Sequence, residues 1–219
     1  MLMKAQMVPM PITAAEKFKE AAFFYDVMIS VRLNVRLFPY YLSAFLAALR
    51  SVTDYISNQA TQHEELVTWW QTALENMRND PLLKFLKSKR DVNIHQEPLR
   101  IFFWHGPKFP KKYLQKDDDG AEFIETDLFE WSGTTDEKGQ IIVTMKVGRD
   151  GTEETVEPNV LWAFEEEENE KDVANYCYEG LERVDAIIKE FAALRETLGF
   201  NDEPDPPGTM MMGSLPPSI

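Results

Sequence analysis

The stretch that decides the fold is Phe38-Pro-Tyr-Tyr-Leu-Ser-Ala-Phe-Leu-Ala-Ala-Leu-Arg-Ser-Val-Thr-Asp-Tyr-Ile-Ser-Asn58. Its large apolar residues recur every three or four positions, the spacing of one face of an α-helix. They are Leu42, Phe45, Leu46, Leu49, Val52 and Ile56. Pro39 near the start suits a first helical turn, where a backbone N–H has no intrahelical partner. The stretch therefore predicts a long amphipathic helix whose apolar face must be covered by other elements.

Similar periodicity flanks this helix on both sides. Thr13-Ala-Ala-Glu16 has the form of a capping box, which predicts a helix from there to about Ser30. We expect a third helix over 64–77 and a fourth from Leu82 to near His95, separated by the stretch Asn79-Asp80-Pro81, which breaks the earlier helix and caps the later one. The longest apolar stripe after residue 100 predicts a last helix over 172–198, with Gly199 as its C-cap.

The pattern between these helices is different. Three short stretches rich in β-branched or aromatic residues, 99–104, 123–131 and 140–147, predict about three strands. The segment from Pro107 to Asp119 is expected to be a long loop, with His105 at the turn that ends the first strand. An acidic run over 165–168 is expected to be a solvated loop or helix start.

These expectations define an α+β protein that is mainly α. A helical bundle spans 13–98, a small antiparallel β insertion with an acidic stretch spans 99–171, and a C-terminal helix over 172–199 completes the bundle. Residues 1–12 are expected to be a flexible N-terminus. Residues 200–219 contain five prolines and are expected to be a disordered tail.

Composition excludes several classes of protein. One cysteine in 219 residues rules out an intramolecular disulfide, and Cys177 lies on the apolar stripe of the last helix, where a buried inert thiol is expected. No cluster has metal-ligand spacing and no familiar nucleotide or hydrolase motif is present, so we predict no metal and no cofactor. Charges interrupt the most apolar run, 21–52, and no secretory signal is seen. A cytoplasmic protein with no membrane contact is expected.

Charge is unevenly distributed along the chain. The formal net charge is −14, which disfavours general nucleic-acid binding. However, the segment 81–116 holds nine basic and two acidic residues, and the segment 117–170 holds eighteen acidic and three basic. Either the two segments neutralise each other on the folded surface, or the basic one forms a local anion site.

The most informative histidine, His95, stands at the end of the basic run Lys87-Ser-Lys-Arg90-Asp91-Val-Asn-Ile-His95. An arginine such as Arg90 can bind a phosphate with two hydrogen bonds, and a histidine can move a proton at neutral pH. Together they would suffice for metal-independent RNA cleavage by the neighbouring 2′-hydroxyl. For His63 and His105, a surface, capping or turn role is expected, with a site role as the alternative for His105.

Helix geometry limits this interpretation. Residues five apart on a regular helix lie roughly 140° apart around its axis. Arg90 and His95 therefore converge only if the helix unwinds near Asn93 or if two copies of the chain meet. In the purely structural alternative, Arg90 pairs with a carboxylate of a neighbouring helix and His95 caps the helix end. Arg50 and Asp54, four apart on the second helix, are expected to form an ion pair and can also brace Arg90.

An Arg-polar-x-x-x-His run at the end of a late helix resembles the HEPN family (higher eukaryote and prokaryote nucleotide-binding domains). Here the run is Arg90, Asp91 and His95, with four residues (91–94) between the arginine and the histidine. The segments 38–54 and 89–95, with Trp69-Trp70 between them, look like a group of uncharacterised bacterial HEPN-like proteins. The resemblance covers about 13–95 and, loosely, 172–198. In the family the polar residue is often Asn, so Asp91 adds a negative charge.

The resemblance implies a HEPN-like antiparallel helical bundle. It also implies a homodimeric, metal-independent endoribonuclease of the toxin or defence type, in which two Arg…His motifs share a cleft. Arg90 would bind the scissile phosphate, His95 would act as acid and base, and Asp91 would orient one of them. RNA would be the substrate, and a cognate antitoxin or another protein would be a partner.

Two other functions stay open. A non-catalytic interaction module would bind a protein partner through its β insertion and acidic stretch. A small-molecule or nucleotide binder would need an enclosed pocket lined by residues such as Trp104, Trp131 and Trp162.

Overall fold

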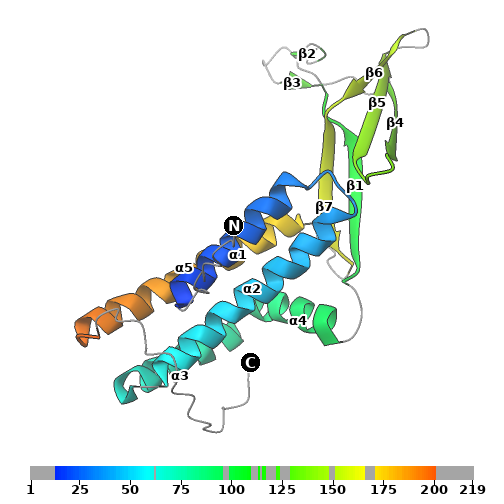
Figure 1. Cartoon of the computed structure of the whole chain (residues 1–219). Helices are drawn as coiled ribbons and strands as arrows, with labels where there is room; N and C mark the ends of the chain where they lie inside the picture. Colours follow the sequence, from blue (N-terminus) through cyan, green and yellow to red (C-terminus); the bar gives the residue numbers. More distant parts are fainter. Residues whose placement is uncertain are drawn as a thin grey trace, which may run out of the picture. The chain divides into compact units, whose positions relative to one another are not determined.

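The computed structural model describes residues 13–61, 63–95, 99–109, 113, 115–116, 122–123, 129–147, 151–165 and 171–200. Within them the chain is α+β and mainly helical, and every strand pair is antiparallel (Figure 1). The helices are α1 (Ala14–Ser30), α2 (Leu37–Ala60), α3 (Glu64–Asn79), α4 (Pro81–His95) and α5 (Val173–Thr197). The strands are β1 (Ile101–Pro107), β2 (Gln115–Lys116), β3 (Glu122–Phe123), β4 (Phe129–Thr135), β5 (Ile141–Val147), β6 (Glu153–Val156) and β7 (Pro158–Phe164).

The helix ends follow the chemistry predicted from the sequence. Thr13 and Glu16 form the capping box, each backbone N–H donating to the other's side chain at 3.2 Å. Asp80 accepts hydrogen bonds from the first amides of α4, where Pro81 occupies the first helical position. α5 ends in a Schellman motif in which Gly199 has φ +76° and the Phe200 N–H donates to the Arg195 carbonyl.

The chain folds into two compact units. The first comprises Met1–Phe24, Ala44–Asp91 and Tyr178–Ile219, and the second comprises Tyr25–Ser43 and Val92–Cys177. In the first unit the buried faces of the helical segments form an apolar core. Its large members are Phe45, Leu46, Leu49, Val52, Ile56, Leu66, Trp70, Met77, Leu82, Leu86, Leu181, Val184 and Phe191.

The second unit is built around the antiparallel ribbon of β1 and β7 and the three-stranded sheet β4-β5-β6. Phe38 stacks on Trp162 with ring centroids 4.3 Å apart, and the Trp162 indole N–H donates to the Arg32 carbonyl at 2.8 Å. Asn34 forms a β-bridge with Gln140 and donates from its side chain to the Lys138 carbonyl. Because these bonds satisfy buried polar groups, they fix the connection before α2 against the strands.

The expectations for the β region need correction. The described residues hold seven strands, not about three, because β2 and β3 pair with each other and β6 and β7 pair with strands earlier in the chain. The expected loop over 107–119 is wrong at Pro107, which belongs to β1, and at 115–116, which form β2. His105 lies within β1 opposite Val160, not at a terminal turn. In the predicted strand 123–131, residues 124–128 lie outside the described residues.

Other expectations have simpler outcomes. Cys177 is buried, and burial raises the pKa of its thiol well above the usual range, with the Asp172 carboxylate adding to the shift. None of the helices in the described part of the chain has the length and apolar composition needed to cross a membrane. The flexible N-terminus predicted over 1–12 lies outside the described residues, as do residues 201–219 of the tail predicted over 200–219 and residues 166–168 of the acidic run 165–168.

Candidate functional site

A pocket of about 420 Å³ opens in the first unit among residues of α2, α3, α4 and α5. Its lining consists of Leu46, Leu49, Arg50, Thr53, Met77, Arg78, Leu83, Lys84, Leu86, Lys87, Arg90 and Val184. Every one of these residues belongs to the first unit. The volume lies within the range of small-molecule and cofactor sites in proteins.

The aliphatic part of the pocket depends on close helix packing. Leu46, Leu49, Leu86 and Val184 are almost fully buried, and Leu83 is partly exposed. Gly180 on α5 lets these helices approach, because a Cβ at this position would lie 2.4 Å from Leu86 Cδ1. A larger residue there would force the Leu86 side chain to move, and Leu86 lines the pocket.

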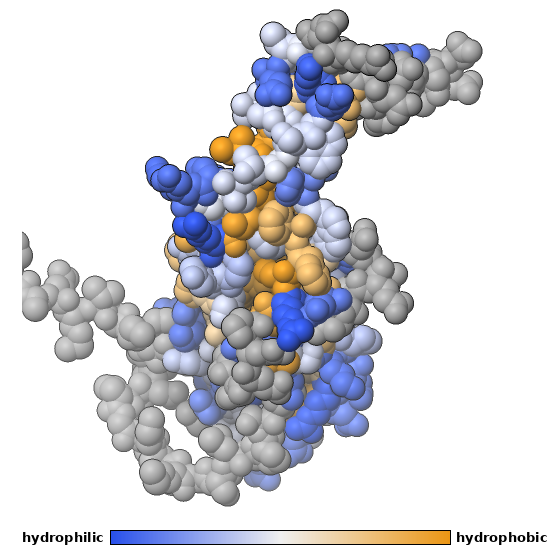
Figure 2. Space-filling model, turned by 90° about the vertical axis from the view of Figure 1, so that its right-hand side faces the viewer, coloured by the Kyte–Doolittle hydropathy of each residue, from blue (hydrophilic) through white to orange (hydrophobic). Residues whose placement is uncertain are grey.

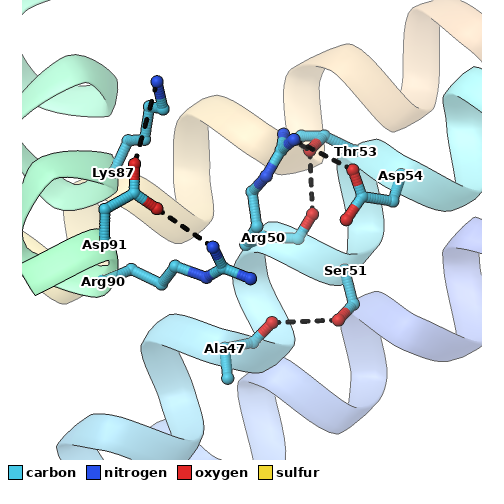
Figure 3. A network of polar contacts seen from close by, with 8 residues as sticks. All are labelled: Ala47, Arg50, Ser51, Thr53, Asp54, Lys87, Arg90 and Asp91. Atoms are coloured by element: carbon cyan, nitrogen blue, oxygen red, sulfur yellow. Dashed lines mark hydrogen bonds and ion pairs between the residues drawn. The ribbon is translucent and has the colours of Figure 1, made fainter. Parts of the chain in front are cut away.

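Five cationic residues line the pocket, and no acidic one does among the described residues. They are Arg50, Arg78, Lys84, Lys87 and Arg90. Lys84, Lys87 and Arg90 are spaced three apart on α4, a spacing that puts side chains on neighbouring positions of one helix face. The side chain of Arg90 extends from α4 toward α2, which carries Arg50 (Figure 3).

Two carboxylates form ion pairs with some of these cations. Asp91 lies 3.0 Å from Arg90 Nη1 and 3.8 Å from Lys87 Nζ, and Asp54 lies 3.0 Å from Arg50 Nη2 (Figure 3). The Arg50–Asp54 pair predicted from the sequence is therefore confirmed. Five cations against these two acids leave an excess of three positive charges at the pocket, in a chain whose net charge is −14. The pocket is thus a local anion-attracting region in an acidic protein.

Arg90 keeps hydrogen-bonding capacity that the protein does not use. Its Nε is buried and has no hydrogen-bond partner among the described residues. Its only ion pair with a described residue is to Asp91 on the same helix, so the expected pairing with a neighbouring helix is not seen. The side chain is 26% exposed, which leaves it accessible to a ligand. A buried N–H without an acceptor costs about 1–3 kcal/mol.

The predicted partner of Arg90, His95, is the last residue of α4. The helix continues through Asn93, whose side chain donates to Ser43 Oγ, so the unwinding that would bring Arg90 and His95 together in one copy is absent here. A regular helix places the two residues roughly 140° apart. The side chain of His95 lies outside the described residues. A site that uses both residues therefore needs them from two copies of the chain.

The other histidines have structural surroundings. His63 occupies the N-cap position of α3 without a side-chain cap, and its ring stacks on Phe200 at 3.8 Å. His105 packs its ring against the backbone of Gly133, where a Cβ would lie 2.0 Å from His105 Cε1. His105 Nδ1 is buried without a partner among the described residues. Neither ring lines the cation-rich pocket.

The three tryptophans proposed to enclose a ligand differ in their surroundings. Trp162 is buried against Phe38, whereas Trp104 and Trp131 are about half exposed. The pocket on the helical unit contains none of them. Among the described residues, no group of three or more His, Cys, Asp or Glu side chains is placed to hold a metal ion.

Sequence reasoning identified Arg90 but missed most of the pocket. Arg78, Lys84 and Lys87 were not singled out, although the three-residue spacing of cations along α4 was a usable signal. Comparison with known protein families, with curated proteins and with solved structures finds no match.

Proposed function

We propose that this chain is a HEPN-like helical protein that binds RNA phosphate at the cation-rich pocket and cleaves RNA as a homodimer, without a metal ion. One observation carries the proposal. Arg90, the residue that the sequence pattern selects as a phosphate ligand, lies in a pocket with four other cations and has a buried Nε without a partner among the described residues. An arginine in this state presents a hydrogen-bond donor and a positive charge to an incoming phosphate.

The neighbours of Arg90 support a positioning role for Asp91. Its carboxylate holds Nη1 of Arg90 at 3.0 Å, which restricts the guanidinium, while the side chain as a whole stays 26% exposed. Lys84, Lys87 and Arg50 would then stabilise the charge that grows on the phosphate during the reaction. Such stabilisation needs no metal ion, because the protein supplies the positive charge itself.

At each composite site, both proton transfers would come from the one His95 that the other copy supplies. A neutral imidazole accepts the proton of the ribose 2′-hydroxyl, and the oxygen attacks phosphorus to form a 2′,3′-cyclic phosphate. The bond to the 5′-oxygen breaks, and a protonated imidazole gives that leaving oxygen its proton. Within one copy, the regular helix α4 places Arg90 and His95 on different sides of its axis. The proposal therefore requires Arg90 of one copy to face His95 of the other.

The experiment incubates the purified full chain with a mixed RNA pool in EDTA, beside Arg90→Ala and His95→Ala variants. Lys189→Ala is the matched control, since it also removes one positive charge from the first unit, at a side chain that is 75% exposed. Wild type and control should cleave, and both test variants should lose activity by at least a hundredfold. Cleavage by all four proteins at one rate, or by none, contradicts the proposal.

As the resemblance implies a toxin or defence protein, an antitoxin-type protein partner belongs to the same proposal.

A second candidate function, a non-catalytic protein-interaction module, rests on the second unit. Phe102 and Trp104 lie on the same face of β1, are about half exposed and have ring centroids 6.4 Å apart. On the face of the molecule drawn in Figure 2, apolar residues reach the surface among hydrophilic ones. Exposed aromatic side chains are enriched where proteins bind one another. Loss of partner binding in Trp104→Ser with unchanged RNA cleavage would assign this surface to an interaction.

A further inference from the structure

We infer that the pocket of the first unit binds a small amphipathic anion, an aliphatic chain that ends in a carboxylate or a phosphate monoester. This inference stands on the lining of the pocket and does not depend on RNA cleavage. RNA phosphate needs only the cationic part of the pocket, whereas the aliphatic part has no role in the proposed reaction. The two parts together are suited to a ligand with a charged head and an apolar body.

The apolar part of the pocket is suited to an alkyl chain. Six apolar residues line the pocket, and all are leucine, methionine or valine. They are Leu46, Leu49, Met77, Leu83, Leu86 and Val184. Such a surface gains free energy in proportion to the apolar area that a ligand covers, without any directional requirement. A methylene chain is apolar along its whole length and has no directional bonds to satisfy, so it suits this surface.

The lining also disfavours a nucleobase. No aromatic, amide or carboxylate side chain lines the pocket among the described residues. The one lining hydroxyl, that of Thr53, already donates to the Arg50 carbonyl and accepts from the Arg50 guanidinium. The N–H groups of a buried base would therefore find no side-chain acceptor here, and each unpaired donor weakens binding. An alkyl chain has no such groups.

The position of the anionic head follows from the polar contacts. Arg90 has a buried Nε without a partner among the described residues, and it adjoins Leu86 and Lys87 in the lining. A carboxylate or phosphate at the partly exposed guanidinium of Arg90 would lie among cations of α2 and α4. The chain behind it would extend over the leucines. The excess of positive charge at the pocket repels a cationic head, so a cationic ligand with an alkyl chain of the same length should not bind.

The test uses titration calorimetry on the full chain with laurate, dodecyl phosphate, dodecanol and dodecylamine below their critical micelle concentrations, and with inorganic phosphate. Laurate or dodecyl phosphate should bind at one site per chain, dodecanol and dodecylamine should not, and inorganic phosphate should bind more weakly than dodecyl phosphate. Across octanoate, decanoate and laurate, affinity should rise about fourfold for each added methylene. Binding of dodecanol or dodecylamine as tight as that of laurate, or a flat chain-length series, would overturn the inference.

Variants of two lining residues test whether laurate binds in this pocket. Arg90→Met, which keeps an unbranched side chain and removes the charge, should weaken laurate binding at least tenfold, while Lys189→Met should leave it unchanged. Leu83→Trp places a larger side chain at the partly exposed wall and should abolish binding of laurate. The chain-length series keeps the inference testable if Leu83→Trp does not fold. Equal laurate affinity in Arg90→Met and wild type would overturn it. A protein that binds laurate and does not cleave RNA would support this inference and contradict only the ribonuclease proposal.

Discussion

The N-cap of α4 is a local feature whose energetic contribution can be worked out in advance. Asp80 Oδ1 accepts hydrogen bonds from the backbone N–H groups of Leu82 and Leu83 at 2.9 and 3.0 Å, and its second oxygen pairs with Arg183. Replacing an N-cap aspartate by alanine costs about 1–2 kcal/mol. The ion pair adds about 0–1 kcal/mol, because the Arg183 side chain is 43% exposed. We therefore expect Asp80→Ala to lower the free energy of unfolding by about 2 kcal/mol.

Asp80→Asn separates the two contributions. Asparagine keeps the acceptor oxygen for the two amides and loses the charge, so its cost should stay below about 1 kcal/mol. For a chain of this length, 1 kcal/mol corresponds to about 2–4 °C in Tm, so Asp80→Ala should melt about 4–8 °C below wild type and Asp80→Asn within about 4 °C. Circular dichroism at 222 nm follows the helices directly. A loss under 0.5 kcal/mol in Asp80→Ala would refute the assignment of Asp80 as the cap.

The same residue gives a pH dependence with a defined sign. Burial raises the pKa of Asp80, but hydrogen bonds from Leu83, Arg183 and Leu82 outweigh it and hold the pKa below the ordinary value of 3.8. A carboxylate with a lowered pKa contributes stability that is complete above its ordinary pKa and is lost as pH falls through the folded value. The stability difference between wild type and Asp80→Asn should therefore be constant above about pH 5 and shrink below pH 4. An unchanged difference at pH 3 would contradict this.

Three further predictions concern the second unit. Gly133→Ala should lower the free energy of unfolding by more than about 2 kcal/mol, measured by chemical denaturation, because its Cβ would overlap the His105 ring. Trp162→Phe should cost about 1 kcal/mol or more in the same measurement, since the indole N–H bond to the Arg32 carbonyl is lost, and no loss would count against that bond. Cys177 should resist a thiol reagent at pH 8 until denaturant is added, because burial raises the pKa of its thiol; fast native labelling would contradict this.

The features that the sequence predicted well are those decided within a few residues. The capping box of Thr13 and Glu16, the Asp80-Pro81 start of α4 and the Gly199 end of α5 are each set by chemistry within a single turn. The long apolar stripe of α2 is likewise a local pattern, and the helix extends from Leu37 to Ala60. Such signals need no knowledge of the rest of the fold.

The β region shows why other features could not be predicted. β7 begins at Pro158 and its last three residues are all buried, so it lacks the alternation that marks a half-exposed strand. Its partner is β1, in which Phe103 lies opposite Trp162. The extension of β1 to Pro107 exists only because β7 is beside it, and a pairing across more than fifty residues leaves no local signal.

Only part of the candidate site could be predicted, because its residues come from distant parts of the chain and leave no local signal that they lie together. A short motif on one helix was enough to select Arg90, and the helix period was enough to show that one chain does not bring it next to His95. The pocket itself combines cations of three helices with leucines of α2 and α4. Helix packing, which is close at Gly180, brings those residues to one place. The sequence contained the cations without showing that they share a pocket.

The central claim, that Arg90 of one copy works with His95 of the other, is tested most directly by mixing two inactive variants. Arg90→Ala and His95→Ala are unfolded together, refolded together and assayed on RNA in EDTA beside each variant alone. Random assortment gives heterodimers with one intact composite site, so the mixture should recover about a quarter of wild-type activity while each variant alone stays inactive. A mixture as inactive as its components, although heterodimers form, would contradict the account.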